Sequence, residues 1–489
     1  MTITLIGLGP GDPSLLTRQA WDLLDRAEEV YLRTARHPTV TDLPSHLTLH
    51  SFDDLYETLD DFGAVYDAIA ERVVELGKRP QGVLYAVPGH PMVGEASVQR
   101  VLVLARQEGV DVRLIEGLSF VEPVLSFLGL DALSGLQLVD ATDLAICHHP
   151  PLDPDRPALV GQVYGSRLAS EVKLTLMNAY PDDHLVTLVH AASTGQGRVE
   201  TVPLYELDRG HGVDHLTSLY VPPLPQIGGL AAFQDTVARL RAPDGCPWDR
   251  EQTHQSLRNN LLEETYEVLV ALDEEDEDKL CEELGDLLMQ IVMHVQIATE
   301  GGAFRFADVV GRIDAKLKRR HPHVFGQVDV EGTADVLRNW EAIKADERQT
   351  AGHGQASRLA SVPEILPSLA RAQAYSERAA RHGFDWPDME GVLAKLTEEV
   401  AELEAAQDVD ERERELGDVL FTMVNVARWL GVDAESALRG ACQRFAQRYA
   451  SMEHQARRQG TDLATLSVAE QNELWNEAKS QESRIAGSR

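Results

Sequence analysis

Two stretches of the chain carry acidic side chains at a spacing that could hold divalent metal ions. The first runs through "LLEETYEVLVAL" (261–272) and "EELGDLLMQIV" (282–292), and the second through "LTEEVAELEAAQ" (396–407) and "RELGDVLFTMV" (414–424). In each stretch the acids fall as ExxE and then ExxD, and residues three apart share one helix face. Two such helices packed antiparallel would bring four carboxylates to one point. The two sets are Glu264, Glu267, Glu283 and Asp286, and Glu399, Glu402, Glu415 and Asp418.

Carboxylates held this close repel one another, so each set needs a compensating charge. Hard divalent ions such as Mg²⁺ or Mn²⁺ would supply it through oxygen ligands. The alternative is a solvated acidic face, which is the ordinary explanation of a single ExxE pair in an acidic helical protein. Recurrence in register with "ELGD" favours the metal interpretation. Gly285 and Gly417 lie inside these helices, where glycine is unfavourable, which predicts close packing or ligand approach there.

The whole helical region repeats itself. The first carboxylate blocks are offset by 135 residues (399 − 264) and the "ELGD" blocks by 132 (418 − 286). "KLKRR" (316–320) aligns with "RFAQR" (444–448), and "NWEAIK" (339–344) aligns with "LWNEAK" (474–479) at 135 (479 − 344). Near-constant offsets over four blocks predict two copies of one helical unit.

Basic residues recur downstream of both acidic sets and are candidate phosphate ligands. They are Lys316, Arg320 and Lys344 in the first copy, and Arg444, Arg448 and Lys479 in the second. The alternative is that they form salt bridges with the many glutamates. Trp340 and Trp475 are interpreted as packing residues.

Length and charge limit the classes of function. A chain of 489 residues predicts about three or four domains. The net charge of −34 disfavours binding to nucleic-acid polymers or anionic membranes, but it permits a small phosphorylated substrate screened by cations. Four scattered cysteines without a CxxC pair predict reduced, mostly buried thiols. With no signal peptide or membrane span in the sequence, we expect a cytoplasmic protein.

Two breaks divide the chain, "YVPPLPQIGG" (220–229) and "RQTAGHGQAS" (348–357). Before the first, strand-like runs such as "TITLIGLG" and "GVLYAVPG" alternate with helical patterns, which predicts an α/β region with a mostly parallel sheet. After it, helical periodicity dominates. The expected organisation is an α/β domain over 1–222 and two all-α bundle units over 230–347 and 358–489.

The helical region resembles the MazG family of nucleoside triphosphate pyrophosphohydrolases. Besides the acidic blocks, "GCPWDREQTHQSL" (245–257) and "KRRHPHVFG" (318–326) carry the resemblance, which covers essentially all of 230–489. It implies a two-copy helical protein, usually dimeric, whose ExxE and ExxD carboxylates bind Mg²⁺. It also implies cleavage of an NTP or dNTP to the nucleoside monophosphate and pyrophosphate. We therefore expect a homodimer formed through the helical region.

The two copies differ at positions that matter for catalysis. Lys395 precedes the second acidic set where the first has Asn260, and Asn425 lies seven residues after Asp418 where the first has Met293. The family's second copy typically carries this lysine and asparagine, so the resemblance implies that the C-terminal copy is the main catalytic site. Glu398 or Glu402 is the candidate general base. The first copy keeps all four acids and is a second candidate metal site.

The N-terminal stretch "LIGLGPGDPSLLT" places Gly7, Gly9 and Gly11 between a strand and a helix. Glycines there let the backbone approach a ligand, and a helix N-terminus favours anions. A tight structural turn is the alternative, since GxGxG departs from the dinucleotide fingerprint.

Together with "VLYAVPGHPMVGEAS" (83–97), "VRLIEGLSFVEP" (112–123) and "VTLVHAASTGQGRVETVPLYEL" (186–207), this stretch resembles the S-adenosylmethionine-dependent tetrapyrrole methylases. The resemblance implies two α/β subdomains with the methyl donor between them. Many such enzymes carry Gly-Asp-Pro where this chain has Gly89, His90 and Pro91, a departure compatible with ligand binding that counts against methyl transfer. The candidate cofactor residues are Gly7, Gly9, Pro10, Gly11, Pro88, Gly89, His90, Val93 and Ser119.

Two rival functions stay open. The main activity could be methyl transfer to a tetrapyrrole, or the helical part could be a non-catalytic dimerisation scaffold. A third metal site at "CHHPP", using Cys147, His148 and His149, is disfavoured because adjacent ligands cannot all face one ion without an irregular loop.

Overall fold

The computed structural model divides into two compact units, Met1–Gln252 and Thr253–Arg489. It describes residues 1–59, 61–350, 357, 359–360 and 362–486. Most of the expected break at 348–357, and residue 358 where the second helical copy is expected to begin, lie outside the described residues.

The first unit begins with a parallel sheet ordered β3-β2-β4-β1-β5. Its elements are β1 (Thr2–Gly7), α1 (Arg18–Leu24), β2 (Glu29–Leu32), β3 (Thr48–Ser51), α2 (Asp53–Thr58), α3 (Phe62–Gly77), β4 (Val83–Val87), α4 (Ala96–Glu108), β5 (Asp111–Ile115) and α5 (Val121–Leu128). The central strand β1 is buried along most of its length because sheet neighbours flank it on both edges and side chains from α3 and α4 pack against it. This subdomain confirms the α/β prediction.

The second subdomain has a mixed sheet ordered β6-β7-β10-β8-β9. Its elements are β6 (Gln137–Asp140), α6 (Ala141–Ala145), β7 (Ala158–Gly161), α7 (Ser166–Leu176), β8 (Leu185–His190), β9 (Arg198–Pro203) and β10 (Thr217–Val221). Only β6 and β7 pair in parallel; the other pairs are antiparallel, so the expectation of a mostly parallel sheet is wrong here. The physical reason is the short connection from β8 to β9, which permits only a hairpin.

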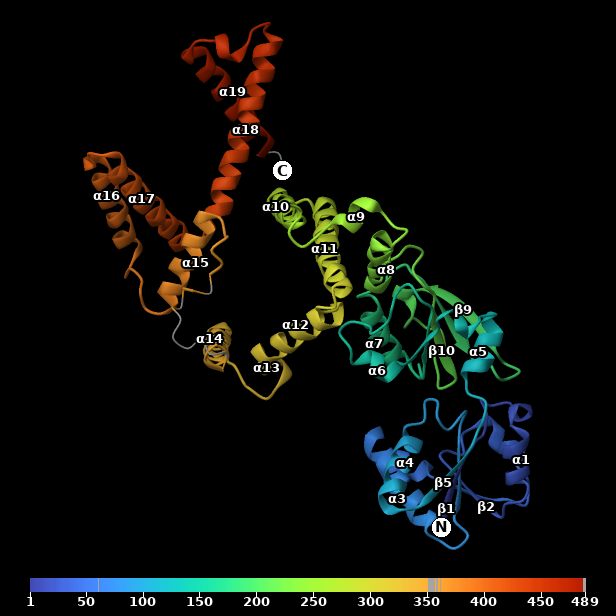
Figure 1. The fold of residues 1–489 in the computed structure, drawn as a ribbon. Coiled ribbons are helices and arrows are strands. Elements are labelled where there is room, and N and C mark those ends of the chain that lie inside the picture. The colour runs from blue at the N-terminus through green and yellow to red at the C-terminus, as the bar shows by residue number, and fades with distance from the viewer. Residues whose placement is uncertain (60, 351–356, 358, 361, 487–489) are drawn as a thin grey trace. The chain divides into compact units, whose positions relative to one another are not determined.

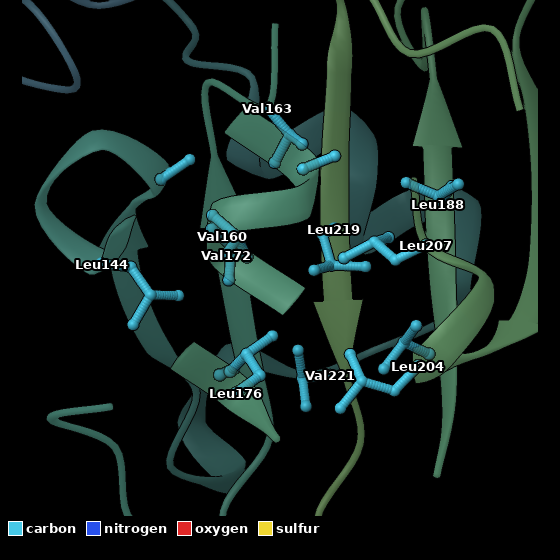
Figure 2. Close-up of a cluster of buried hydrophobic side chains, with 14 of the residues drawn as sticks. Leu144, Val160, Val163, Val172, Leu176, Leu188, Leu204, Leu207, Leu219 and Val221 are labelled. Carbon is cyan, nitrogen blue, oxygen red and sulfur yellow. The ribbon is translucent and has the colours of Figure 1, made fainter. Parts of the chain in front are cut away.

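Aliphatic side chains fill the core of this second subdomain (Figure 2). Leu176 of α7 and Leu219 of β10 are both fully buried, and Leu144 of α6 joins the same cluster. Burial of each such side chain contributes about 1.5–3 kcal/mol relative to exposure. The cluster therefore gives a rigid base to the loops at the strand ends.

The described part of the chain after β10 contains helices and no strand. They are α8 (Leu230–Arg241), α9 (Pro247–Glu251), α10 (Arg258–Glu274), α11 (Glu277–Glu300), α12 (Phe306–Arg320), α13 (Pro322–Phe325), α14 (Thr333–Thr350), α15 (Ser368–Arg381), α16 (Met389–Ala405), α17 (Val409–Trp429), α18 (Ala434–Arg458) and α19 (Val468–Ala486). The division into units falls after Gln252, so α8 and α9 group with the first unit. Among the described residues, no helix is both long and apolar enough to cross a bilayer.

The duplicated unit appears as two helical hairpins, α10–α11 and α16–α17 (Figure 1). Each second helix begins with an aspartate cap: the Asp276 side chain accepts from the backbone N–H of Lys279, and Asp408 accepts from that of Glu411. The caps are offset by 132 residues (408 − 276), as are the "ELGD" blocks. Equivalent local signals thus start equivalent helices.

Candidate metal and nucleotide site

Each hairpin gathers three carboxylates. Ligand oxygens of Glu264, Glu267 and Glu283 all lie within 4.8 Å of one another, and so do those of Glu399, Glu402 and Glu415. The first two acids of each set lie on one helix and the third lies on the next, so hairpin packing assembles the set. The sequence prediction that acids from two antiparallel helices converge is consistent with this arrangement.

Asp286 and Asp418 lie outside these three-membered sets. Asp286 is nevertheless close enough for its charge to raise the pKa of Glu264. Asp418 is exposed on α17. The predicted four-carboxylate point is therefore a three-carboxylate point in each copy. Each aspartate lies nearly one helical turn beyond the glutamate of the set, on a side chain one methylene shorter.

Mutual proximity shifts the titration of the clustered acids. Loss of solvation, followed by the charges of Asp286 and Glu267, raises the pKa of Glu264. The pKa of Glu283 is raised by the same kinds of cause, and the pKa of Glu402 is raised by loss of solvation and then by Glu399. Added positive charge would stabilise these clustered acids, and their hard oxygen donors suit Mg²⁺ or Mn²⁺.

In the first copy the charge of Lys279 acts on Glu283. In the second copy Lys395 supplies a positive charge in direct contact with the acidic set. Its Nζ lies 2.9 Å from Glu398 and 2.8 Å from Glu399, whose side chain is buried. These two hydrogen bonds raise the pKa of Lys395 above its ordinary value. The first copy has Asn260 in this place, so its three carboxylates have no lysine at the equivalent position.

Asn425 lies in a buried polar network behind the second hairpin. It is 1% exposed, its amide oxygen accepts a hydrogen bond from Ser376 of α15, and its amide nitrogen donates to the carbonyl of Phe421. Arg428 donates to the same Ser376 hydroxyl at 2.8 Å and pairs with Asp385 at 3.0 Å. The contacts of Asn425 thus tie α15 to α17.

The candidate phosphate ligands are dispersed over α12, α14, α18 and α19. Arg320 pairs with Glu347 at 2.6 Å, and Arg319 contacts the same carboxylate. Arg320 therefore forms a salt bridge with a glutamate, which was the alternative to phosphate binding. Lys344 lies 3.6 Å above the Trp340 ring, and Arg448 lies 5.4 Å from the Trp475 ring. Lys316, Arg444 and Lys479 are exposed.

The two helical glycines do not pack closely against the described chain. A side-chain carbon built at Gly285 or Gly417 would meet no described heavy atom within 4 Å beyond its own helix and chain neighbours. The close-packing part of the prediction is wrong within one copy of the chain, and ligand approach stays a prediction.

The expected cofactor glycines meet in the first subdomain. The backbone N–H of Gly89 donates to the carbonyl of Gly9 at 2.8 Å, and the N–H of Gly9 donates back at 3.2 Å. A side-chain carbon at Gly7 would lie 2.5 Å from the Gly89 carbonyl and 2.9 Å from Gly117, so glycine is required there. The first three methylase-like motifs therefore converge at the carboxyl ends of β1, β4 and β5.

The remaining candidate cofactor residues surround this point. Ser193, after β8, donates to the Pro10 carbonyl at 2.6 Å, which ties the second subdomain to the glycine loop. The His90 ring accepts from the N–H of Met92, and the Val93 N–H donates to the His90 carbonyl. Ser119 is buried and donates to Glu122 at 2.6 Å. Gly11 is buried, and Pro88 is half-buried.

A buried ion pair near this edge escaped the sequence analysis. Arg33, directly after β2, lies 3.4 Å from Glu95, whose side chain is 4% exposed. Burial raises the pKa of Glu95 to about 7, although Arg33 acts in the opposite direction. Burial and then the Arg33 charge lower the pKa of His37 to about 4. No local pattern in the sequence links these two residues, which lie 62 positions apart (95 − 33).

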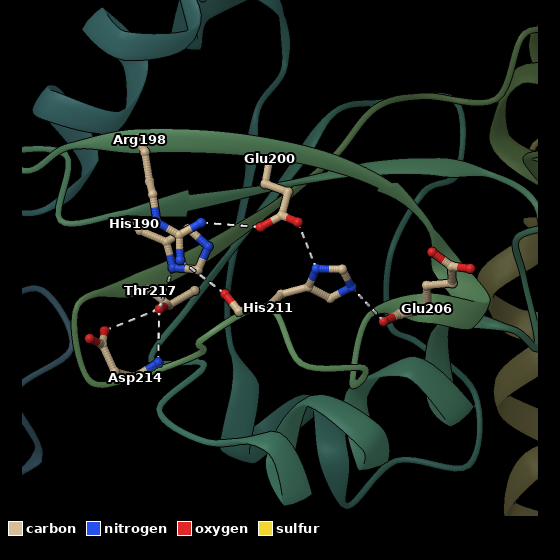
Figure 3. Close-up of polar contacts among 7 residues, drawn as sticks. All are labelled: His190, Arg198, Glu200, Glu206, His211, Asp214 and Thr217. Atoms are coloured by element: carbon tan, nitrogen blue, oxygen red, sulfur yellow. Dashed lines mark hydrogen bonds and ion pairs between the residues drawn. The ribbon is translucent and has the colours of Figure 1, made fainter.

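A second polar network holds the β8–β10 end of the other sheet (Figure 3). His190 contacts the Thr217 hydroxyl at 3.1 Å, and burial lowers the pKa of His190. On β9, Glu200 contacts both His211 at 2.8 Å and Arg198 at 3.1 Å. These contacts fix the hairpin whose loop carries Ser193.

The cysteines give no sign of a metal site. Cys147 donates to the Asp143 carbonyl, and the His149 ring contacts the Pro150 carbonyl. Among the described residues, the acidic sets are the groups of three or more ligands that fit an ion, and "CHHPP" is not one of them. All four cysteines are free, and Cys281 and Cys442 are exposed, which corrects the expectation of mostly buried thiols.

Comparison with known proteins separates the same two regions. A family model described as the MazG nucleotide pyrophosphohydrolase domain matches residues 252–325 and 388–452. A model described as tetrapyrrole (corrin/porphyrin) methylases matches residues 2–208. The first result confirms the predicted duplication, and the second confirms the predicted N-terminal resemblance.

Relatives share these regions. The uncharacterized protein YabN of Bacillus subtilis is 41% identical over 99% of both chains. The nucleoside triphosphate pyrophosphohydrolase/pyrophosphatase MazG of Thermotoga maritima is 46% identical over 50% of this chain and 95% of its own. The nucleoside triphosphate pyrophosphohydrolase of Escherichia coli K12 is 44% identical over 50% of this chain and 94% of its own.

Among solved structures, the uroporphyrin-III-C-methyltransferase of Thermus thermophilus matches 45% of this chain and 91% of its own, with 22% identity and a TM-score of 0.36. Its complex with S-adenosyl homocysteine matches 45% of this chain and 97% of its own, with 21% identity and a TM-score of 0.34.

Proposed function

Because the chain belongs to the MazG nucleotide pyrophosphohydrolase family and carries an N-terminal tetrapyrrole-methylase domain, we propose that it hydrolyses nucleoside triphosphates, as NTP or dNTP, to the monophosphate and pyrophosphate. The observation that carries this proposal is the pair of matching three-carboxylate sets on the two hairpins. A dimerisation scaffold would not need mutually repelling acids held together twice.

The donor set fits Mg²⁺ or Mn²⁺, with Glu399, Glu402 and Glu415 as ligands and Asp418 as a fourth candidate. Bound there, such an ion would neutralise phosphate charge and acidify a water molecule. Glu264, Glu267 and Glu283, with Asp286 nearby, would hold an ion in the first copy. The ion is also what makes a phosphorylated substrate compatible with so acidic a chain.

Within the second copy, Glu402 is the better candidate for the general base. Glu398 accepts a hydrogen bond from Lys395 at 2.9 Å, which disfavours proton uptake, so a Glu402 oxygen that does not bind the ion is the better candidate. Lys395 in turn holds the buried Glu399 in place. Asn425 would then act by fixing α17 against α15.

The six basic residues named above are proposed to contact the triphosphate. Arg444, Arg448 and Lys479 would serve the second copy, and Lys316 and Lys344 the first. Arg320 would have to leave Glu347, whose pKa its hydrogen bond lowers to about 2. We therefore assign Arg320 the smallest role of the six.

We also propose that the helical region forms a homodimer. Exposed apolar residues recur in register on the two "ELGD" helices: Leu284, Leu288 and Ile291 on α11, and Leu416, Leu420 and Met423 on α17. Both sets are offset by 132 (416 − 284) and spaced i, i+4, i+7, which is one helix face. An exposed apolar face of this kind fits a second copy of the chain. Sedimentation equilibrium at micromolar concentration tests this, and a mass near 54 kDa would contradict the dimer.

Product identification tests the hydrolase proposal. The full chain is incubated with Mg²⁺ and each of the four NTPs and dNTPs, and the products are read by ³¹P NMR. The proposal expects pyrophosphate with the monophosphate, and no turnover in excess chelator. Orthophosphate with the diphosphate, or no turnover with any nucleotide, would contradict it.

For the first unit we propose binding of S-adenosylmethionine or a close relative. The support is the convergence of the glycine motifs at one strand edge. Calorimetric titration of the full chain tests it, with Gly89→Val as the variant, because Gly89 has φ +67° and a branched residue there distorts the loop. Equal heats for variant and parent, or none for the parent, would reject the site. Methyl transfer to a tetrapyrrole is the alternative main activity.

Two further proposals concern the binding partners of the protein and the compartment in which it acts. A net charge of −34 favours free nucleotides over nucleic-acid polymers or an anionic membrane surface as partners. Hydrolysis of free nucleotides would place the action of the protein in the cytoplasm.

A further inference from the structure

One buried amide in the first copy has an acceptor without a donor. Gln290 lies on α11, four residues after Asp286, and is 3% exposed. Its Nε2 lies 3.5 Å from Oε1 of Glu264, a member of the first three-carboxylate set. Its Oε1 has no hydrogen-bond partner among the described residues. Because both amide atoms are bonded to one carbon, the unpaired oxygen lies next to the nitrogen that faces Glu264.

This arrangement is unfavourable in the metal-free chain. A buried acceptor left without a donor is destabilising, and an apolar residue of similar size would avoid that cost. The second copy has Thr422 at the equivalent position (422 − 290 = 132), and it too is buried. Packing at this place in the hairpin therefore does not require glutamine, and the Gln290 oxygen lacks a donor within the described part of the chain.

We propose that Gln290 is a positioning residue of a divalent-metal site in the first copy, and that the missing donor is a water molecule carried by the ion. This inference rests on the proposed function. Mg²⁺ gives up its hydration water reluctantly, so an ion held by Glu264, Glu267 and Glu283 would present water O–H donors to its surroundings. The Gln290 nitrogen would orient Glu264 while its oxygen accepts from such a water, in the manner of an outer-shell partner.

The proposal separates the two copies by mechanism. The second copy balances its carboxylates with Lys395, whereas the first has Asn260 there and a buried amide aimed at Glu264. The first copy is then a built metal site with its own supporting residue, and not a degenerate remnant of the second.

The test measures Mn²⁺ binding by electron paramagnetic resonance in the full chain. The parent protein carries Glu399→Gln, Glu402→Gln and Glu415→Gln. These changes remove the second carboxylate set, so that the Mn²⁺ signal measures binding to the first set. Adding Gln290→Met is expected to weaken Mn²⁺ binding 10- to 100-fold, the range usual for an outer-shell partner. Gln290→Leu is made in parallel, so that a packing defect peculiar to one side chain is recognised.

A thermal readout distinguishes positioning from a merely structural role. If Gln290 serves the ion, removing its unpaired oxygen leaves the metal-free Tm equal or higher while Mn²⁺ affinity falls. The matched control is Thr422→Val in a chain whose first set is converted to glutamine, where Mn²⁺ affinity should change less than threefold.

Each other outcome has a definite meaning. Unchanged Mn²⁺ affinity in both Gln290 variants, or a parallel loss of metal-free stability that accounts for the weaker binding, overturns the inference and leaves the proposed function standing. If the parent binds no Mn²⁺ while the chain with an intact second set does, the inference also falls alone. If neither chain binds Mn²⁺, the metal-dependent function falls with it.

Discussion

The two helical copies share a hairpin, a capped second helix and a three-carboxylate set, but they stabilise that set differently. In the second copy, Lys395 lies 2.8 Å from the buried Glu399. In the first, the neighbouring polar group is the Gln290 amide, and the pKa values of both Glu264 and Glu283 are raised. Duplication has thus preserved the acids while the residues that compensate them have diverged.

The largest expected effect comes from removing one carboxylate of the second set. Glu399→Gln should lower kcat/KM for NTP hydrolysis by on the order of 100-fold or more, because a direct ligand matters at least as much as an outer-shell partner. Asp418→Asn should also remove most activity, and Glu264→Gln should have a smaller effect. Exposed Glu404→Gln on the same helix is the control. A greater loss from Glu264→Gln would reverse the ranking of the copies.

Metal removal should destabilise the protein in a pH-dependent way. The pKa values of three clustered acids, Glu264, Glu283 and Glu402, are raised in the folded chain. Without metal, the folded state is therefore favoured at low pH, where these acids are protonated. Its free energy of unfolding falls as pH rises through their folded-state pKa values. Mg²⁺ at about 100 times its Kd adds about 2.7 kcal/mol per site to the free energy of unfolding. The Tm increment from Mg²⁺ should therefore be largest near pH 8 and shrink toward pH 5; an increment independent of pH would argue against binding at these acids.

Asn425→Ala should lower the free energy of unfolding by about 1–3 kcal/mol, because it leaves the Ser376 hydroxyl without its acceptor in a buried network. Denaturant titration measures this loss. Met293→Ala, at the equivalent place in the first copy, is the comparison. If Asn425→Ala keeps full stability and loses activity, Asn425 has a direct role in catalysis and is not only a packing residue.

Lys395→Met should separate metal binding from turnover. Without the ammonium that competes for Glu399, Mn²⁺ should bind the second copy more tightly, while kcat falls by about tenfold, or about 1.4 kcal/mol in the barrier. The reciprocal variant Asn260→Lys should weaken Mn²⁺ binding in the first copy. Weaker Mn²⁺ binding in Lys395→Met would mean that the lysine organises the site more than it competes.

The smallest effect concerns the helical glycines. In a single chain with open space beside them, Gly285→Ala and Gly417→Ala should each raise the free energy of unfolding by about 0.5–1 kcal/mol. In a homodimer that packs on these faces, the same changes should instead weaken association. Thermal melts at two protein concentrations, with sedimentation analysis, distinguish the two results.

The sequence predicted the site residues that recur at regular spacing along the chain. The ExxE spacing and the repeated "ELGD" are local, so they located three carboxylates per copy without a structure. The pairing of Asn425 with Ser376, 49 residues away, depends on tertiary packing and left no local signal. The same holds for the Arg33–Glu95 pair, which parallel strand order brings together across 62 residues (95 − 33).

The prediction of a mostly parallel sheet failed where the length of a connection decides whether two strands pair in parallel or antiparallel. The alternation of strands and helices correctly indicated an α/β first unit, but β8 and β9 are joined by too few residues for a crossover and form a hairpin. Similarly, helical periodicity located α10–α11 and α16–α17 but could not show that the space beside Gly285 is open.

The most direct test of the metal site is a crystal structure of the full chain with Mn²⁺ and a non-hydrolysable triphosphate, using the anomalous signal of manganese. The account predicts a peak about 2.0–2.3 Å from oxygens of Glu399, Glu402 and Glu415, with phosphate oxygens completing the coordination. Nucleotide bound elsewhere, with these carboxylates facing bulk water and no anomalous peak among them, would contradict it.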